Sequence, residues 1–450
     1  MFILKLLILY LPIEVIFLKW LPVSEQMYSL LRQLPDFLIF SMSLVLLFFR
    51  ILSKKTVPII GGKVDLFLSL FIGWAFLTIV LNPSADVFFG IANIKALLRY
   101  ILLVYIVLLL NPSEMQIRSL VSWVFIAILS QIFIATVQFI GGTSVRDILV
   151  ARDISDGIGG VIKVFTGAKL KDTNDLIGTM GDTISFAYMM ILGMVLWFFT
   201  CKFNLLKIFT GFVLFLAFIY LSGSRSVVLS SLLFVFGYFI WQYGFKRLSL
   251  YSVAVLPIFL SVVFVASNIG FFDSAGDNKS FWFIFNSDYI DMALNQRLGI
   301  LVYIVPKLLF TTQNIIGFSP DKYYFAETVA TNLPMIPEIL LAVLPNVLED
   351  VYWVAMYIYY GLAGFILWTG FLTCLYMLFN KFLKHIPRSQ CTLIMIAKSL
   401  LLLSIPLNLF NQAFEVRSFS FYLWLLCALA LVSGRNSLQQ GVSNEGSFNS

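Results

Sequence analysis

The chain has 450 residues, of which 60% are apolar and 12% are charged. A water-soluble core cannot bury so many apolar side chains, so the composition excludes an ordinary soluble enzyme and predicts an all-α, polytopic integral membrane protein. The formal net charge is +7. We interpret this charge as a feature of membrane topology and not as a nucleic-acid-binding patch.

Continuous apolar runs predict about twelve transmembrane helices. The first run carries Lys5 and Glu14 and lacks a small-residue cleavage site, so we expect a membrane span there and not a cleaved signal peptide. The predicted spans, in chain order, are residues 2–18, 36–52, 65–81, 99–111, 119–140, 182–201, 205–222, 226–242, 248–267, 352–379, 391–409 and 418–433.

Basic residues gather in every second loop of this arrangement. Residues 50–65 and 380–390 are rich in lysine and arginine, and the short turns at Arg118 and at Lys202 are also basic. The positive-inside rule then predicts that both termini are cytoplasmic. The net positive charge belongs mostly to the cytoplasmic face.

Two external segments are longer than a turn. They are residues 141–181 and, between predicted helices nine and ten, residues 268–351. The larger segment contains the apolar stretches Leu298–Phe310 and Ile336–Leu348, which predict helices on or re-entering the membrane surface. We expect a single transmembrane domain over residues 1–436, followed by a polar, disordered cytoplasmic tail over residues 437–450.

Several kinds of chemistry are excluded by what the loops contain. The cytoplasmic loops are short and carry no glycine-rich phosphate loop with Lys-Ser/Thr, which argues against nucleotide-dependent chemistry inside the cell. The four cysteines lie in spans or at their cytoplasmic ends, and the single histidine, His385, falls in a cytoplasmic basic loop. We therefore expect no cofactor, no zinc site and no nucleic acid as a partner. We assign no metal ligands, and a divalent cation held by external carboxylates is the alternative that the sequence leaves open.

The string Leu221-Ser-Gly-Ser-Arg225-Ser226 joins two long apolar runs. It places an arginine at the start of a membrane helix, where a cation needs an anionic partner. One of the chain's own carboxylates would serve, and so would a lipid diphosphate. Arg99 and Arg297 also fall at the predicted outer face, and guanidinium groups bind phosphate bidentately. Interfacial anchoring or pairing with external acidic residues is the other explanation for all three.

At these residues the chain resembles a family. The stretch Tyr220-Leu-Ser-Gly-Ser-Arg-Ser-Val-Val-Leu229 is similar to the signature of the O-antigen polymerase and ligase superfamily. In the large external segment, Asn295-Gln-Arg297-Leu is followed by Asn314-Ile-Ile-Gly317-Phe-Ser-Pro320. Then come Glu349-Asp350-Val-Tyr352 and Tyr360-Gly361-Leu-Ala-Gly364. The resemblance covers roughly residues 180–370.

Ligases of this superfamily carry a histidine before predicted span ten, at a fixed spacing from a glycine. Here Asp350 stands at that spacing from Gly361, with no histidine outside the cytoplasmic loop. The resemblance therefore favours a polymerase over a ligase.

The resemblance implies a glycosyltransferase at the outer face of the bacterial inner membrane. It would polymerise polyprenyl-diphosphate-linked oligosaccharide repeat units of an O-antigen, capsule or exopolysaccharide. These undecaprenyl-diphosphate-linked repeats would be both donor and acceptor. A chain-length regulator and a flippase of the same pathway are possible protein partners. The other functions are an O-antigen ligase, or a flippase or transporter for lipid-linked oligosaccharides.

This reaction assigns roles to named residues. Asp350, with Glu349 beside it, is the candidate base, although a helix cap or an ordinary surface acid explains an acidic residue at this position at least as well. Arg225, Arg297 and Arg99 are the candidate diphosphate ligands. Trp282, Tyr289 and Tyr352 are candidate sugar contacts, with membrane anchoring as their simpler role.

The predicted topology places residues 268–351 outside and the loop at 380–390 inside. Reporter fusions after Ser280 and after Lys384 should therefore report opposite compartments. The measurement is paired alkaline phosphatase and green fluorescent protein activity in living cells. If both fusions report one compartment, the topology is wrong, and with it the outer-face placement of every candidate site residue.

Overall fold

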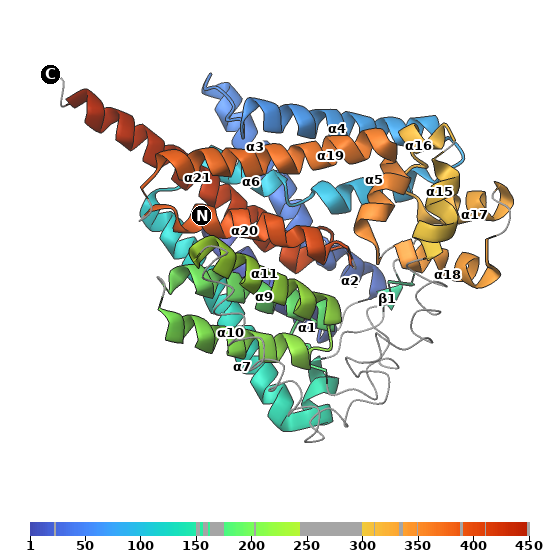
Figure 1. The fold of residues 1–450 in the computed structure, drawn as a ribbon, viewed down its shortest axis with the longest axis horizontal. Coiled ribbons are helices and arrows are strands. Elements are labelled where there is room, and N and C mark those ends of the chain that lie inside the picture. Colours follow the sequence, from blue (N-terminus) through green and yellow to red (C-terminus); the bar gives the residue numbers. More distant parts are fainter. Residues whose placement is uncertain are drawn as a thin grey trace. The chain divides into compact units, whose positions relative to one another are not determined.

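The structure is a computed structural model that is helical through most of the chain (Figure 1). A two-residue strand pair, β1 (Ile154–Ser155) and β2 (Val161–Ile162), runs antiparallel. The described residues are 1–21, 24–149, 154–155, 161–162, 175–201, 204–243, 299–309, 311–332, 336–348, 350–387, 390–409 and 411–447.

The chain divides into two compact units, the first made of residues 1–5, 34–122 and 290–450. Within this unit α19 packs along α4, and α21 packs against α6 and α20 (Figure 1). Its elements are α3 (Leu34–Leu52), α4 (Gly62–Leu81), α5 (Val87–Leu98), α6 (Leu102–Leu110), η3 (Ile300–Ile304), α15 (Val305–Leu308), α16 (Gln313–Ile316), α17 (Lys322–Asn332), α18 (Glu338–Leu348), α19 (Tyr352–His385), α20 (Thr392–Leu407) and α21 (Arg417–Ser447).

The second unit is made of residues 6–33 and 123–289. In this unit α9, α10 and α11 pack against one another, and α2 contacts β1. The helices that lie wholly or mostly in it are α1 (Phe2–Lys19), α2 (Glu25–Arg32), α7 (Glu114–Leu149), α9 (Thr183–Thr200), α10 (Leu205–Leu221) and α11 (Arg225–Tyr243).

Polar residues mark where several of these helices begin. The side chain of Asp86 accepts hydrogen bonds from the amides of Phe88 and Phe89 at the start of α5. Asn204 caps α10 in the same way, through the amide of Lys207. Such caps satisfy amide groups that have no partner inside the helix, so the polar residue between two apolar runs fixes the helix boundary.

The helices are long and apolar enough to identify an α-helical membrane protein. Among the described residues, six helices have the length and composition to cross a membrane, and a bent pair, α5 and α6, makes a seventh if it counts as one span. Each of the twelve predicted spans coincides with a helix except residues 248–267, which lie outside the described residues. The predicted span at 99–111 is the second half of the bent pair, which turns by 44° after Leu98.

Two predictions about the loops have clear outcomes. The stretches predicted as helices inside the large external segment are helical, as η3 with α15 and as α18. For the tail from Ser437 the sequence predicts disorder, whereas the structure continues α21 to Ser447; residues 448–450 lie outside the described residues. The residues before the tail already form a regular helix, so the helix continues into the polar sequence.

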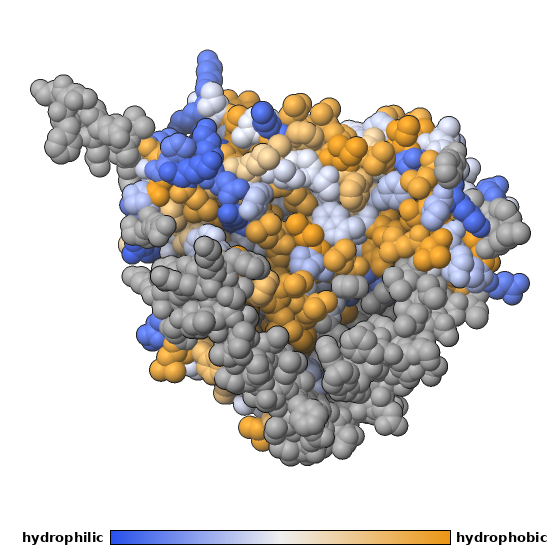
Figure 2. Space-filling view, viewed as in Figure 1, coloured by the Kyte–Doolittle hydropathy of each residue, from blue (hydrophilic) through white to orange (hydrophobic). Residues whose placement is uncertain are grey.

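Large apolar side chains are exposed along the helices, as expected for a surface that faces lipid (Figure 2). On α3, Phe37, Phe40, Leu44 and Phe48 are all more than half exposed, and their spacing places them on one face. Asp36 and Ile39 of the same helix are buried. Because α3 buries an acidic residue and exposes phenylalanines, its polarity is reversed relative to a helix of a soluble protein.

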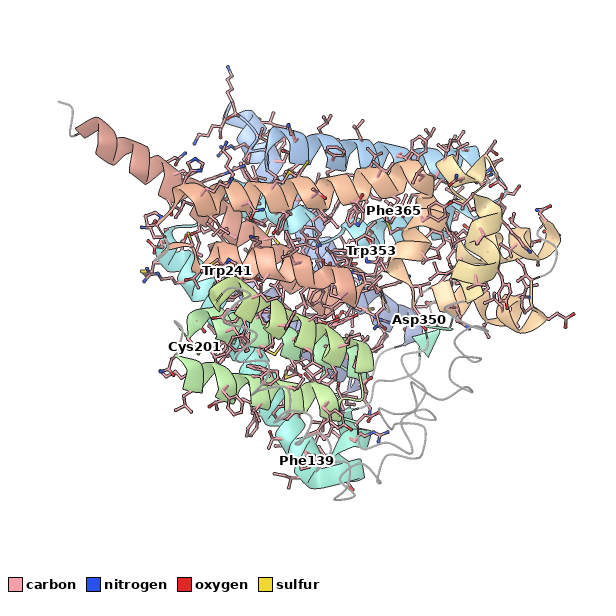
Figure 3. The ribbon with its side chains drawn as sticks, in the orientation of Figure 1. Phe139, Cys201, Trp241, Asp350, Trp353 and Phe365 are labelled. Carbon is pink, nitrogen blue, oxygen red and sulfur yellow. The ribbon has the colours of Figure 1, made fainter. Side chains whose placement is uncertain are left out.

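Helix α19 is broken near its middle, at Gly361, where φ is +65°. Trp353 before the break and Phe365 after it have ring centroids 6.1 Å apart (Figure 3). Twelve residues of straight helix span about 18 Å, so this contact requires the bend at the break. The carbonyl of Tyr360, next to the break, accepts a hydrogen bond of 2.7 Å from the indole of Trp74.

The segment after α16 crosses α19 at this break. Gly317 has φ of +86°, and the amide of Phe318 donates to the carbonyl of Ile358 at 2.9 Å. A Cβ atom on Gly361 would collide with the backbone of Ile315, and one on Gly317 would collide with the backbone of Tyr359. Two glycine-containing motifs that the sequence singled out therefore meet, and both glycines are required by backbone-to-backbone approach.

Replacing Gly361 with alanine should destabilise the first unit strongly. The new Cβ meets fixed backbone atoms, and the left-handed backbone adds a cost of about 1 kcal/mol or more. The thermal unfolding midpoint in detergent should fall by several degrees. The matched control is Gly73→Ala in α4, where a Cβ meets nothing within 4 Å. That change should leave the midpoint unchanged or raise it, and equal midpoints for both variants would contradict the proposed crossing.

Candidate anion-binding site

Three basic side chains of the first unit surround the buried carboxylate of Asp36. An oxygen of Asp36 lies 3.4 Å from the ammonium of Lys95, and 3.7 Å from a guanidinium nitrogen of both Arg99 and Arg417. The side chain of Asp36 is only 5% exposed. Asp36, Lys95, Arg99 and Arg417 thus form one cluster, which we call the Asp36 cluster. Apart from the Lys95–Arg99 pair, its members are 59 or more positions apart in the sequence.

Each member of the cluster stands at the end of a helix. Asp36 lies in the first turn of α3, Lys95 in the last turn of α5, and Arg99 is the C-terminal cap of α5 at the bend before α6. These three charges are favourable for the dipoles of their helices. Arg417 is the first residue of α21, where the dipole disfavours a cation, so an anionic group is needed beside it.

Arg99 is held by several groups at once. One of its terminal nitrogens donates a hydrogen bond of 2.6 Å to the backbone carbonyl of Glu415, and its guanidinium lies 5.0 Å from the ring centre of Tyr100. Its Nε is buried and has no hydrogen-bond partner among the described residues. Arg99 is therefore fixed in place, and its Nε is a donor that the described residues leave unsatisfied.

The carboxylate at the centre is unusual for a buried charge. Neither oxygen of Asp36 makes a hydrogen bond within the described part of the chain. Charge-assisted hydrogen bonds to carboxylates are normally about 2.7–2.9 Å long. The three cations lie farther from Asp36 than this, so none of them makes a short charge-assisted hydrogen bond to its carboxylate. Such an arrangement of cations suits an anion with several oxygen atoms.

Asp350, the candidate base, belongs to a segment that packs against residues 412–415. This is the loop whose Glu415 carbonyl accepts the hydrogen bond from Arg99. The side chain of Gln412 donates to the carbonyl of Leu348 at 3.1 Å, and the rings of Tyr352 and Phe414 are 5.3 Å apart. Asp350, labelled in Figure 3, lies in the sequence between Leu348 and Tyr352, the two residues that make these contacts. Residues 412–415 thus connect the Asp350 segment on one side with the guanidinium of Arg99 on the other.

Asp350 is half-buried in a turn, and its amide donates to the carbonyl of Val347 at 2.9 Å. The N-terminal cap of α19 is Val351, which makes no side-chain cap. Asp350 therefore does not occupy the capping position that offered the simpler explanation. Tyr352, a candidate sugar contact, is 1% exposed, and its ring packs in an aromatic group with Trp353 and Phe414.

In the second unit, the turn around Gly223 lies against a carboxylate of the chain. The amide of Leu176 donates to the carbonyl of Leu221 at 2.9 Å. Gly223 has φ of +72°, and a Cβ there would lie 3.0 Å from an oxygen of Asp175. An acidic residue therefore lies beside this turn, but whether the Arg225 cation pairs with a carboxylate of the chain or with a diphosphate stays a prediction. The backbone of Arg225 begins α11, and its side chain lies outside the described atoms.

Asp182 is a second acidic group that the sequence did not single out. It is the N-terminal cap of α9 and accepts a hydrogen bond of 2.6 Å from the amide of Ser185. Because the capping role accounts for its position, we assign it no catalytic role.

The structure therefore brings one predicted arginine, Arg99, into a charged site. Arg297, Glu349, Trp282 and Tyr289 lie outside the described residues. Sequence analysis missed Asp36, Lys95 and Arg417. The signal that was available is modest: each lies at the boundary of an apolar run, and Lys95 and Arg99 are spaced to share one helix face.

Comparisons with known proteins do not assign this chain. No family model matches it, and no curated protein matches it.

Proposed function

We propose that this protein is a glycosyltransferase that polymerises polyprenyl-diphosphate-linked oligosaccharide repeat units at the outer face of the bacterial inner membrane. The observation that carries the proposal is the convergence of Lys95, Arg99 and Arg417 on Asp36, at the ends of apolar helices. Cations in this position suit an anionic group carried by a lipid, and a diphosphate offers oxygen atoms for more than one guanidinium.

The chemistry needs two kinds of group. A sugar hydroxyl of the acceptor attacks the anomeric carbon of the lipid-linked donor chain. The bond to the polyprenyl diphosphate breaks, the diphosphate leaves as an anion, and the hydroxyl proton passes to a base. Cations placed where the leaving charge develops lower the barrier, and this is the role we give to Arg99 and Arg417, with Lys95 beside them. No nucleotide is required, because the carrier diphosphate is itself the leaving group.

Asp350 is the proposed base. It lies at the end of a membrane helix, is half-buried, and belongs to a segment that packs on the loop that also accepts a hydrogen bond from Arg99. The reaction requires a carboxylate near the cations that bind the diphosphate, because the carbon that is attacked is bonded to a diphosphate oxygen. Glu349, beside it in the sequence, is the second carboxylate of the proposal.

Two related functions would use the same anion site. A ligase would transfer the finished chain to a different acceptor, and a flippase would move the lipid-linked repeat without breaking a bond. Neither the Asp36 cluster nor the helices separate these functions from a polymerase. What separates them is the product, because a polymerase alone makes a ladder of lipid-linked chains from purified repeats.

Arg99→Ala should reduce polymer formation by about 100-fold or more, because it removes a fixed cation from the leaving group. Arg99→Lys should restore only part of the activity, since an ammonium cannot make a planar two-pronged contact. The assay is the gel ladder made by purified protein from synthetic lipid-linked repeats. The control is Arg118→Ala, whose side chain is 78% exposed and pairs with Glu114. Undiminished ladders from Arg99→Ala would remove Arg99 from the site.

Asp350→Asn keeps the size of the side chain but cannot accept a proton at neutral pH. A positioned base contributes roughly a hundred- to ten-thousand-fold in rate, so long polymer should disappear while single lipid-linked repeats accumulate. Glu349→Gln should lower the activity less. Glu338→Gln, an exposed acid in α18, is the matched control and should leave the ladder unchanged. A normal ladder from Asp350→Asn would leave Glu349 as the next carboxylate to test.

A further inference from the structure

The Asp36 cluster differs from an ordinary structural ion pair in its geometry. A buried carboxylate that serves only to stabilise a fold is normally saturated with short hydrogen bonds, since an unsatisfied buried charge is costly. Asp36 has three cations within 3.7 Å, yet neither of its oxygens makes a hydrogen bond among the described residues. The carboxylate therefore offsets the positive charge of the cations by its proximity and not through short hydrogen bonds.

Exposure within the cluster is graded. The side chain of Lys95 is 46% exposed, Arg417 is 19% exposed and Arg99 is 12% exposed, whereas Asp36 is 5% exposed. The oxygens of Asp36 are wholly covered. Lys95 is therefore the cation that an incoming anion meets most readily, whereas the covered oxygens of Asp36 are out of its reach.

We propose that Asp36 is a positioning residue that limits how tightly the Asp36 cluster holds a diphosphate, so that the diphosphate leaves after each transfer. The inference rests on the proposed function, because that reaction ends with a polyprenyl diphosphate on the cations. Three cations alone would bind this product firmly and slow turnover. A fixed negative charge at 3.4–3.7 Å from each cation weakens the attraction for any second anion at the same place.

The same carboxylate holds the three cations near one another before any ligand is present. Their helices, α5 and α21, would otherwise end in like charges that repel. Asp36 thus allows the three cations to lie close together and also weakens their attraction for a diphosphate. Removing the charge should shift the balance toward tighter binding, because Arg99 is also held by the carbonyl of Glu415 and by Tyr100.

The first experiment measures binding of inorganic pyrophosphate to the full-length protein in lipid nanodiscs by isothermal titration calorimetry. Asp36→Asn should bind about tenfold more tightly than the wild type, since one nearby negative charge is removed. Glu338→Gln removes the same charge from an exposed position in α18 and should not change the affinity. A second series with undecaprenyl diphosphate in the nanodisc shows whether the lipid-borne or the free diphosphate is preferred.

The second experiment measures turnover. Asp36→Asn should lower both kcat and KM in multiple-turnover polymerisation, because product release becomes slower. Its single-turnover rate should stay near that of the wild type. A purely structural role for Asp36 would instead lower the amount of folded protein and leave the affinity per folded molecule unchanged.

Two outcomes overturn the inference. One is unchanged or weaker pyrophosphate binding by Asp36→Asn. The other concerns a second variant, which is used if Asp36→Asn does not fold. Asp36→Glu keeps the charge and brings the carboxylate nearer to the cations, so its affinity for pyrophosphate should be equal to or lower than that of the wild type. Tighter binding by Asp36→Glu contradicts the proposal. If the wild type itself does not bind a diphosphate, or Arg99→Ala binds as well as the wild type, it is the proposed function that fails.

Discussion

The burial of one carboxylate among apolar helices is the constraint on which the first unit depends. A charge removed from water needs opposite charges close to it, and Asp36 at the start of α3 obtains them from the end of α5 and the start of α21. This requirement brings together helix ends that are far apart in the sequence. It also explains how an arginine is tolerated at the start of α21, where the helix dipole is unfavourable to a cation.

A second constraint acts on the backbone. Within a membrane, backbone amide and carbonyl groups must find partners inside the protein, so a break in a helix is tolerated only where other groups replace the lost bonds. At Gly361 the indole of Trp74 and the segment around Gly317 supply these partners. The break bends α19, and residues 350–352 at its start then pack on the loop before α21. The position of Asp350 thus follows from a backbone requirement some ten residues away.

These two constraints meet at residues 412–415. This loop receives the guanidinium of Arg99 at the carbonyl of Glu415, and it contacts the Asp350 segment through Gln412 and Phe414. One short loop therefore contacts both the fixed cation Arg99 and the segment that carries Asp350. The proposed transfer reaction uses both, and the proposed control of product release uses the buried carboxylate beneath the cations.

The sequence by itself determined the class of the protein and the position of most helices, because membrane spans follow from the length of apolar runs and polar caps mark their ends. It also identified Arg99 and Asp350 as candidates, and the two glycine motifs that meet at Gly361. Only the tertiary structure decided which charges meet. Asp36, Lys95 and Arg417 each look like an ordinary residue at a helix end, because sequence patterns carry no information on which helix ends adjoin. That depends on how α3, α5 and α21 pack, and packing is set by contacts between residues distant in the chain.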